Sequence, residues 1–502
     1  MKKIILTTLN ARYSHSSLAL RYLYANLKDL KEDALILEYV INENMQGIAE
    51  KILEHEPKIV GISVYIWNAD DVHALIEVIK KVSPQTKIIL GGPEAGYLPH
   101  RVDFSKADYV VQGEGEEVFY QLCCEILSGK EKQENYIKAP MVDLSKIILP
   151  YDDYTDHDVQ HRYIYVEASR GCPFLCEFCL SAIDEKVRNF SVDILIDEFE
   201  KLWQRGVRNF KFIDRTFNIN MKFATRILDF FLAKEEAFFA HFEVIPDHFP
   251  DVIKEKIALF PKGSLQLEVG IQTLNQEIAK RIDRPLKIEK IKKNIAFLEA
   301  TDVHMHLDLI VGLPGEDLVS FGKNLDVLTS LSTAEIQIGI LKKLSGTTLS
   351  RHDEEFGMVY SDLPPFDVLQ THAVPFKQIQ QMKRFARFWD LYYNSGNFKA
   401  SMQLLWKDKS VFESFWDLSL WIISQTQSTW KISLDRLGEL LFEYMTSQLH
   451  LDESFVSQTI VEDIFAIKGR NIPKKLRPFI KEAPLGKGEK VESSMKRQIA
   501  RQ

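Results

Sequence analysis

The chain has 502 residues, of which 45% are hydrophobic and 27% charged, a composition that fits about three globular domains and excludes a disordered, collagen-like or disulfide-scaffolded chain. Its net charge of −8 argues against a nucleic-acid-binding surface over most of its length. No apolar run approaches the roughly 18 residues of a membrane span, and the short apolar stretch after Lys3 lacks the small-residue cleavage site of a signal peptide. We therefore expect a cytoplasmic protein with no membrane segment.

Residues 1–135 alternate short apolar runs with amphipathic stretches. Strands are predicted at Lys3–Leu9, Ala34–Val40, Ile59–Tyr65, Lys87–Leu90 and Tyr109–Gln112, with helices around Leu18–Leu30, Ile48–Glu54, Ala74–Val82 and Glu116–Leu127. Buried strands that alternate with helices form parallel sheets. The pattern predicts an α/β domain with a flavodoxin-like or Rossmann-like parallel sheet.

Polar and glycine-rich loops follow the predicted strands of this first domain. In open parallel sheets, ligands bind beyond the carboxyl ends of the strands, and glycine lets a ligand approach the backbone closely. Tight turns also need glycine without any ligand. The candidate binding residues are Asn10, His15, Tyr65, Gly91, Gly92, Pro93, Glu94, Gly113, Glu114, Gly115 and Glu116.

Residues 136–162 are polar and contain two prolines, so they are predicted to form a linker. The strand–helix alternation restarts over residues 163–360. Six strands are predicted, near Tyr163–Ala168, Asn209–Ile213, Ala240–Ile245, Ser264–Val269, His304–Val311 and Glu335–Leu341. Six such units suit an open, partial (β/α)6 barrel, whose active site belongs at the carboxyl ends of the strands.

Residues 361–465 carry 18 aromatic residues in 105 positions, several at helical spacing. They predict a mostly helical domain in which this stripe forms either the core or a lid over a substrate. The segment 466–502 is basic, with eleven Lys or Arg against three Glu from Lys468 onward. It is expected to be either a solvated flexible tail or an arm that contacts RNA or phosphate.

The most specific motif is Ser169-Arg-Gly-Cys172-Pro-Phe-Leu-Cys176-Glu-Phe-Cys179, directly after the first strand of the second series. A structural zinc site would need a fourth ligand, and no further Cys or His lies at a suitable spacing nearby. Three thiolates on one loop can instead hold three irons of a 4Fe-4S cluster. The fourth iron is then open to a small molecule that chelates through an amine and a carboxylate.

This motif resembles the loop of the radical S-adenosylmethionine (SAM) superfamily, which carries an aromatic residue, here Phe178, before the last cysteine. Later motifs follow in the same order as in relatives of oxygen-independent coproporphyrinogen oxidase and in methylthiotransferases. The resemblance implies that Phe178 and the Ile310–Pro314 backbone, including Gly312, lie near the adenine. It also implies ribose contacts by Gln272 and Asp308, a contact of Arg284 with the SAM carboxylate, and SAM-site roles for Glu243 and Glu268.

One position departs from the superfamily pattern. After the second strand of the series, Asp214 and its neighbours replace the common Gly-Gly-Glu sequence. Asp214 can still accept a hydrogen bond from the SAM amine, so it stays among the candidate SAM-binding residues.

A parallel α/β domain before such a barrel is similar to the cobalamin-binding subclass of the superfamily, and the third segment is similar to an uncharacterised C-terminal domain (DUF4080-like). The first domain lacks the Asp-x-His-x-x-Gly motif that supplies a histidine ligand to cobalt. The resemblance therefore implies base-off cobalamin without a histidine ligand, with its nucleotide tail in the sheet crevice. A degenerate domain that binds no cofactor is the alternative.

The resemblance implies an enzyme that cleaves SAM reductively to a 5′-deoxyadenosyl radical and transfers a methyl group from cobalamin to an unactivated centre. One alternative is a radical rearrangement or oxidation of the same architecture without methylation. An alternative from another class is a non-catalytic iron–sulfur or RNA-binding module. The expected partners are a substrate that the sequence does not identify and an external reductant such as flavodoxin or ferredoxin.

Overall fold

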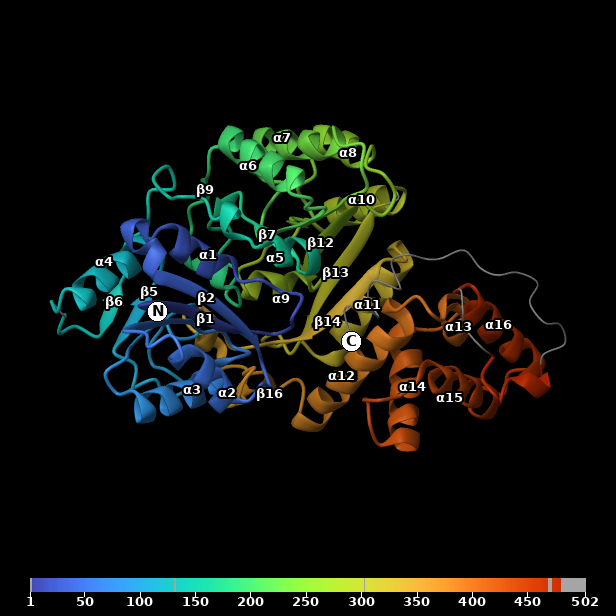
Figure 1. The fold of residues 1–502 in the computed structure, drawn as a ribbon. Helices are drawn as coiled ribbons and strands as arrows, with labels where there is room; N and C mark the ends of the chain where they lie inside the picture. The colour runs from blue at the N-terminus through green and yellow to red at the C-terminus, as the bar shows by residue number, and fades with distance from the viewer. Residues whose placement is uncertain (1, 131, 302, 468–471, 480–502) are drawn as a thin grey trace.

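The computed structural model describes residues 2–130, 132–301, 303–467 and 472–479. Over these residues it contains two six-stranded parallel sheets, each with its own helices, followed by a group of C-terminal helices (Figure 1). The predicted α/β fold class is confirmed. None of the described helices is long and apolar enough to span a membrane.

The first sheet has the strand order β2-β1-β3-β4-β5-β6, which is the flavodoxin-like doubly wound order. Successive strand residues point to opposite faces, so Ile5 packs with α2 and α3 while Ile4 packs with α1 and α4. The elements are β1 (Ile4–Asn10), α1 (Leu18–Ala25), β2 (Ala34–Val40), α2 (Met45–Leu53), β3 (Ile59–Ser63), α3 (Ala69–Val82), β4 (Lys87–Gly91), β5 (Tyr109–Gln112), α4 (Glu116–Leu127) and β6 (Tyr136–Lys138).

The sixth strand differs from the prediction, which placed a linker from residue 136 onward. Residues Tyr136–Lys138 pair in parallel with Val110–Gln112 at the edge of the sheet. An edge strand of three residues with one buried face carries too few apolar positions to stand out from a polar segment. The connection to the second sheet then includes the short helix α5 (Asp156–His161).

The second sheet has the order β14-β13-β12-β11-β10-β7, with β7 and β14 as unpaired edges, so the predicted partial barrel is confirmed. Its strands are β7 (Ile164–Val166), β10 (Asn209–Phe212), β11 (Phe239–Val244), β12 (Leu265–Gln272), β13 (His304–Val311) and β14 (Glu335–Ile340). The covering helices are α6 (Val192–Gln204), α7 (Met221–Leu232), α8 (Asp251–Ile257), α9 (Gln276–Arg281), α10 (Ile288–Glu299) and α11 (Leu318–Leu331).

The barrel strands present apolar residues to the helices and polar residues to the interior. In β12 the residues Leu265, Leu267, Val269 and Ile271 are buried, and the alternate positions from Gln266 to Gln272 are half-buried. This alternation has the two-residue period of a strand. The interior of the barrel is therefore polar along its length, which is the wall that a charged ligand needs.

The C-terminal helices are α12 (Phe376–Trp389), α13 (Lys399–Leu405), α14 (Val411–Thr426), α15 (Leu434–Ser447) and α16 (Glu453–Phe465), preceded by the hairpin β15 (Val359–Tyr360) and β16 (Val368–Gln370). The aromatic stripe of α12, including Phe385 and Trp389, is fully buried and belongs to one hydrophobic core with the barrel. The stripe is therefore core, not a lid. The expected basic tail over 466–502 lies largely outside the described residues.

Candidate functional site

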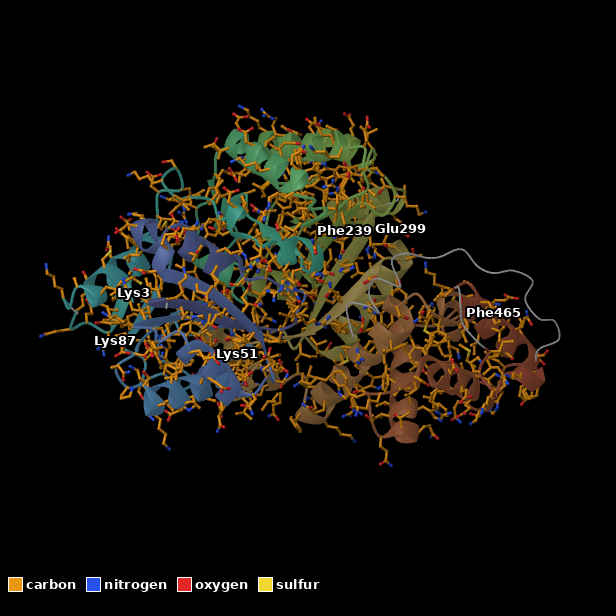
Figure 2. All side chains as sticks on the ribbon, in the orientation of Figure 1. Lys3, Lys51, Lys87, Phe239, Glu299 and Phe465 are labelled. Atoms are coloured by element: carbon orange, nitrogen blue, oxygen red, sulfur yellow. The ribbon has the colours of Figure 1, made fainter. Side chains whose placement is uncertain are left out.

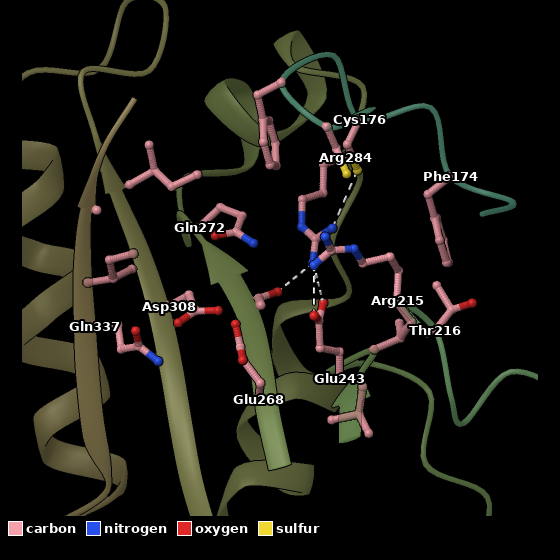
Figure 3. Close-up of a pocket in the computed structure, with 18 of the residues that line it drawn as sticks. Phe174, Cys176, Arg215, Thr216, Glu243, Glu268, Gln272, Arg284, Asp308 and Gln337 are labelled. Carbon is pink, nitrogen blue, oxygen red and sulfur yellow. Dashed lines mark hydrogen bonds and ion pairs between the residues drawn. The ribbon is translucent and has the colours of Figure 1, made fainter. Parts of the chain in front are cut away.

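A cavity of about 390 Å³ opens at the carboxyl ends of the barrel strands. The three predicted cluster cysteines line it together with predicted SAM-site residues from β11, β12 and β13. Figure 3 shows Cys176, Arg284, Arg215 and Glu243 along one side, with Glu268, Asp308 and Gln337 across from them. The structure thus brings together predicted residues that are up to 138 positions apart in the sequence, from Cys172 to Ile310.

The cysteine loop begins after β8 (Ser169–Arg170), which pairs with β9 (Arg188–Asn189). Gly171 has φ +87°, and a Cβ there would lie 2.3 Å from the Lys186 carbonyl oxygen, so only glycine fits. The Cys172 N–H donates to the Asp184 carbonyl at 2.9 Å. These contacts fold the loop back on itself and aim its sulfurs into the cavity.

Burial raises the pKa of the Cys176 thiol, and the nearby Arg284 guanidinium opposes that shift. Arg284 donates to Cys176 Sγ at 3.4 Å and also to the Gly270 carbonyl. Metal binding favours the thiolate, so Arg284 supplies positive charge where a cluster would place negative charge. Among the described residues that line this cavity there is no fourth cysteine and no histidine. The donor set fits a cluster with one open iron better than closed zinc.

Glu177, between Cys176 and Phe178, anchors the cysteine loop to the segment that follows the barrel. Its side chain is buried and accepts from His352 Nε2 at 2.5 Å and from the Arg351 guanidinium. Both partners lie in the turn η4 (Thr348–His352), which follows the barrel. The segment after β14 therefore positions the cysteine loop.

We expect the His352→Ala variant to lose cluster during purification, because the buried Glu177 carboxylate then lacks one of its donors, at a cost of about 1–3 kcal/mol. The measurement is iron per chain after anaerobic gel filtration, alongside the denaturation midpoint. His352→Gln keeps a donor and should retain more iron. Equal iron in wild type and His352→Ala would show that this contact does not hold the loop.

Seven predicted SAM-site residues line the cavity, namely Phe178, Glu243, Glu268, Gln272, Arg284, Asp308 and Ile310. Burial raises the pKa of Asp308 well above its ordinary value, and the neighbouring Glu268 and Glu243 carboxylates add to the shift. Glu243 is already paired with Arg215, so a positive charge placed near Glu268 and Asp308 would favour the ionised form of Asp308. The sulfonium and the ammonium of SAM are such charges.

Two of the predicted SAM-site residues, Asp214 and Gly312, are not among the residues that line this cavity. Asp214 is buried, and its oxygens accept from the Ala168 N–H at 3.0 Å and the Ser169 hydroxyl at 2.5 Å. Burial raises the pKa of Asp214 to about 6, although the hydrogen bonds from Ser169 and Ala168 lower it in part. Gly312 also lies away from the cavity, and a Cβ there would meet the Val368 side chain at 2.6 Å. Its role is close packing of the barrel against β16.

Sequence reasoning missed Arg215. Its guanidinium pairs with Glu243 at 2.7 Å and lies on the cavity wall. The period-2 pattern of β10 could have found it, because Phe210, Phe212 and Asp214 share the core side while Lys211, Ile213 and Arg215 share the other. Phe174, Thr216 and Gln337 also line the cavity without having been predicted.

A second, larger cavity of about 840 Å³ lies between the carboxyl ends of the first sheet and the barrel. Ten of the eleven predicted binding residues lie on its first-domain wall, and the exception is Glu94. The ten are Asn10, His15, Tyr65, Gly91, Gly92, Pro93, Gly113, Glu114, Gly115 and Glu116. Its barrel wall includes Tyr165 and Lys211. Arg215 and Glu243 line both cavities. The ion pair between them therefore marks the place where the two cavities meet.

Glycine is required on the first-domain wall. Gly92 has φ +95°, and a Cβ there would lie 2.5 Å from the Val64 carbonyl oxygen. Gly113 has φ +97° and faces the Ala139 carbonyl oxygen in the same way, at 3.2 Å. Both glycines thus pack closely against neighbouring backbone and line the cavity without a side chain of their own. A large ligand can approach backbone amides and carbonyls here without meeting side chains.

Glu94 is the one predicted cobalamin-binding residue that is not among the residues lining the larger cavity. It is buried away from the cavity and accepts a bidentate ion pair from Arg101, with the nearest contact at 2.7 Å. Arg101 also donates to the Ser345 hydroxyl and the Lys343 carbonyl. Glu94 thus links the first domain to the segment after β14. No local sequence signal marks that long-range partner.

Glu114 and Glu116 line the cavity but are held by arginines of the cysteine loop region. Arg170 lies 3.3 Å from Glu114 and 2.7 Å from Glu116, and it also pairs with Glu167 at 3.1 Å. Arg188 pairs with Glu114 at 2.5 Å. This carboxylate–arginine network joins the first domain to the loop that carries the cysteines.

The His15 side chain on the cavity wall is held by Tyr165. Its Nδ1 lies 2.5 Å from the Tyr165 hydroxyl, and the two rings stack. Burial, with the charges of Lys211 and Arg12, lowers the pKa of His15 to about 4. The ring is therefore neutral at pH 7 and is oriented by Tyr165.

Family models match three parts of the chain. They are a B12 binding domain at residues 4–123, the radical SAM superfamily at 166–328 and a protein of unknown function, DUF4080, at 354–502. Each match coincides with one of the three parts of the fold described above. The chain therefore carries a radical SAM domain, with a B12 binding domain before it and a DUF4080 domain after it.

The chain is similar to several curated methyltransferases. An uncharacterized methyltransferase of Pyrococcus horikoshii is 25% identical over 62% of this chain and 73% of its own length. Cytidylyl-2-hydroxyethylphosphonate methyltransferase of Streptomyces wedmorensis is 24% identical over 58% and 64%, respectively. The cobalamin-dependent radical SAM methyltransferase TokK of Streptomyces tokunonensis is 23% identical over 66% and 56%. The chain thus matches between about half and three quarters of these relatives.

Two solved structures share the fold. The cobalamin-dependent SAM radical enzyme OxsB, with aqua-cobalamin and SAM bound, has a TM-score of 0.64 and 14% identity over 99% of this chain and 83% of its own. The radical SAM methyltransferase TsrM of Kitasatospora setae, with cobalamin and a [4Fe-4S] cluster bound, has a TM-score of 0.58 and 15% identity over 70% and 77%. The arrangement of first sheet, barrel and following segment is therefore that of cobalamin-dependent radical SAM enzymes.

Proposed function

We propose that this protein is a cobalamin-dependent radical SAM methyltransferase. Cys172, Cys176 and Cys179 would hold a 4Fe-4S cluster, the smaller cavity would bind SAM, and the larger cavity would bind cobalamin. The observation that carries the proposal is the junction of the two cavities at Arg215 and Glu243. A substrate at this junction could face both cofactors at once.

When bound, the cluster supplies the electron that cleaves SAM to a 5′-deoxyadenosyl radical, and cobalamin supplies the methyl group. Arg284 and the carboxylates of Glu268 and Asp308 orient SAM through its opposite charges. The buried strand ends exclude water from the reacting atoms. The Arg215–Glu243 ion pair holds both side chains in the wall that the two cavities share, so the same pair would bound a ligand in either cavity.

The function is tested by counting products of SAM after anaerobic incubation with substrate and reductant. Methyl transfer consumes two SAM molecules per turnover and gives one S-adenosylhomocysteine for each 5′-deoxyadenosine. A radical rearrangement or oxidation gives 5′-deoxyadenosine without S-adenosylhomocysteine. No SAM cleavage at all would favour a non-catalytic iron–sulfur module. The substrate and the reductant, for which a flavodoxin or ferredoxin is the natural candidate, are to be found by this assay.

We propose base-off cobalamin without a histidine ligand. The support is that His15, the one histidine on the described wall of the larger cavity, is tied to Tyr165 through Nδ1 and stacks on its ring. The cob(II)alamin form should then show an electron paramagnetic resonance spectrum without superhyperfine splitting from an axial nitrogen. Such splitting, lost in His15→Ala, would contradict this mode of binding. A matched control is His55→Ala, because His55 follows α2 in the sequence and is not among the residues that line the cavity.

A further inference from the structure

A second cluster of metal-binding side chains lies at the opposite end of the barrel from the cysteines. His304 and His306 stand two residues apart on β13, so both point to the barrel interior. Glu335 opens the neighbouring strand β14 and lies in register with His306. These strands begin near Glu299, which is labelled in Figure 2. At about 3.3 Å per residue, His304 is roughly 13 Å below Asp308 of the SAM cavity.

The three side chains converge on one point. His304 Nε2 lies 3.2 Å from one Glu335 oxygen, and His306 Nε2 lies 3.0 Å from the other. One ligand atom from each residue lies within 4.8 Å of the other two. The imidazole rings are 4.9 Å apart at nearly a right angle. Two imidazoles and one carboxylate at this spacing are a common donor set for first-row divalent metals.

The two histidine rings are close enough to share one ion. Their centroids lie 4.9 Å apart, and each ring has its Nε2 within 3.2 Å of a Glu335 oxygen. A divalent ion lets both rings stay neutral while all three groups donate lone pairs to it. The His304 side chain is one third exposed, against 11% for His306 and 14% for Glu335. Solvent can therefore deliver the ion and complete its coordination with water.

The surroundings of His306 match those of a metal ligand. The Gln337 amide lies 2.9 Å from Nδ1 of His306, and the Gln266 amide lies 2.9 Å from both ring nitrogens, so an ion bound at Nε2 would take the place of the Gln266 contact there. Rotation of the Gln337 amide by half a turn places its oxygen beside Nδ1, where it accepts the Nδ1–H of a ring bound through Nε2. Such outer contacts fix the tautomer and the orientation of ligating histidines.

We propose that His304, His306 and Glu335 form a second metal site, which takes a divalent first-row transition metal, zinc being the ion to test. The ion ties β13 to β14 at the end of the barrel where both strands begin. The site is separate from the cysteines and contains nitrogen and oxygen donors only. It stands whether or not the proposed methyl transfer is correct.

The test uses the full-length protein with its iron–sulfur cluster assembled anaerobically, stripped of loose metal, and given one equivalent of zinc. We expect one zinc per chain after gel filtration and a zinc X-ray absorption spectrum that fits nitrogen and oxygen neighbours without sulfur. His304→Ala and Glu335→Gln should each lower zinc affinity ten-fold or more. Gln337→Leu, which keeps all three ligands, should weaken binding to a smaller extent.

His55→Ala is the matched control and should bind zinc like the wild type. The iron content of every sample shows whether a variant still folds and holds its cluster, and Glu335→Gln preserves the shape of the side chain. Sulfur neighbours in the zinc spectrum would place the ion on the cysteine loop and overturn the proposal. Zinc that is absent from the wild type, or retained equally in all variants, would overturn it as well.

Discussion

Replacing Cys176 by alanine should reduce SAM cleavage to the background rate and remove most of the bound iron. Cys176 is buried in the cavity wall, and its sulfur accepts from Arg284 at 3.4 Å. Because the position is buried, a water molecule cannot easily take the place of the missing sulfur as a ligand to iron. Three thiolates are the minimum that leaves one iron open, and two do not hold a four-iron cluster in place. The measurements are 5′-deoxyadenosine formed per chain and iron per chain under anaerobic conditions.

Cys123→Ala is the control for this prediction. Cys123 lies on α4 in the first domain, and burial raises the pKa of its thiol, so it behaves as a small apolar side chain. This variant should keep full iron and full SAM cleavage. If Cys176→Ala still cleaved SAM at the wild-type rate, the cysteine loop would not be the cluster site.

The second large effect concerns Arg170, and we expect Arg170→Met to destabilise the folded protein by about 3–5 kcal/mol. The side chain is buried among Glu114, Glu116 and Glu167, and methionine fills its volume without its charge. Three carboxylates then remain close together with Arg188 as the nearest cation. The measurement is the free energy of unfolding from denaturant titration, together with retention of the cysteine-bound iron.

The loss in Arg170→Met should depend on pH. Burial already raises the pKa of Glu167 to about 7 in the presence of Arg170. A carboxyl whose pKa is higher in the folded state than in the unfolded state takes up a proton on folding, so its penalty is absent below the unfolded pKa, grows as the pH rises from the unfolded to the folded pKa, and levels off above it. We expect a smaller destabilisation at pH 5.5 than at pH 8. Arg226→Met, which removes an exposed pair with Asp193, should change stability little at either pH.

A loss in Arg170→Met that is the same at both pH values would show that packing, not charge, carries the role of this residue. A loss no larger than that of Arg226→Met would show that the network does not join the two domains.

Much of the fold could be predicted because buried parallel strands are short apolar runs between amphipathic helices. The strands from β1 to β5 and all six barrel strands lie within a few residues of their predicted positions. β6 was missed because three residues at a sheet edge carry too little apolar signal. The cysteine loop was predicted from spacing alone, since the chemistry of three thiolates needs them on one short segment.

The errors in the site have a common physical cause. Asp214 and Glu94 are carboxylates at strand ends, as predicted, but each is satisfied by a partner that only the tertiary structure brings near: the Ala168 N–H and Ser169 hydroxyl in one case, Arg101 in the other. Arg215 could have been found by following the alternation of β10 one residue further. Contacts between segments far apart in the sequence, such as Glu177 with His352, carry no local signal at all.

The most direct test of the account is to purify the protein anaerobically from cells supplied with cobalamin and to count iron and cobalt in the same sample. The account predicts about four irons and one cobalt per chain, with the iron lost in Cys176→Ala. Iron without cobalt would leave the SAM site standing and contradict methyl transfer from cobalamin. Neither metal above background would contradict the whole account.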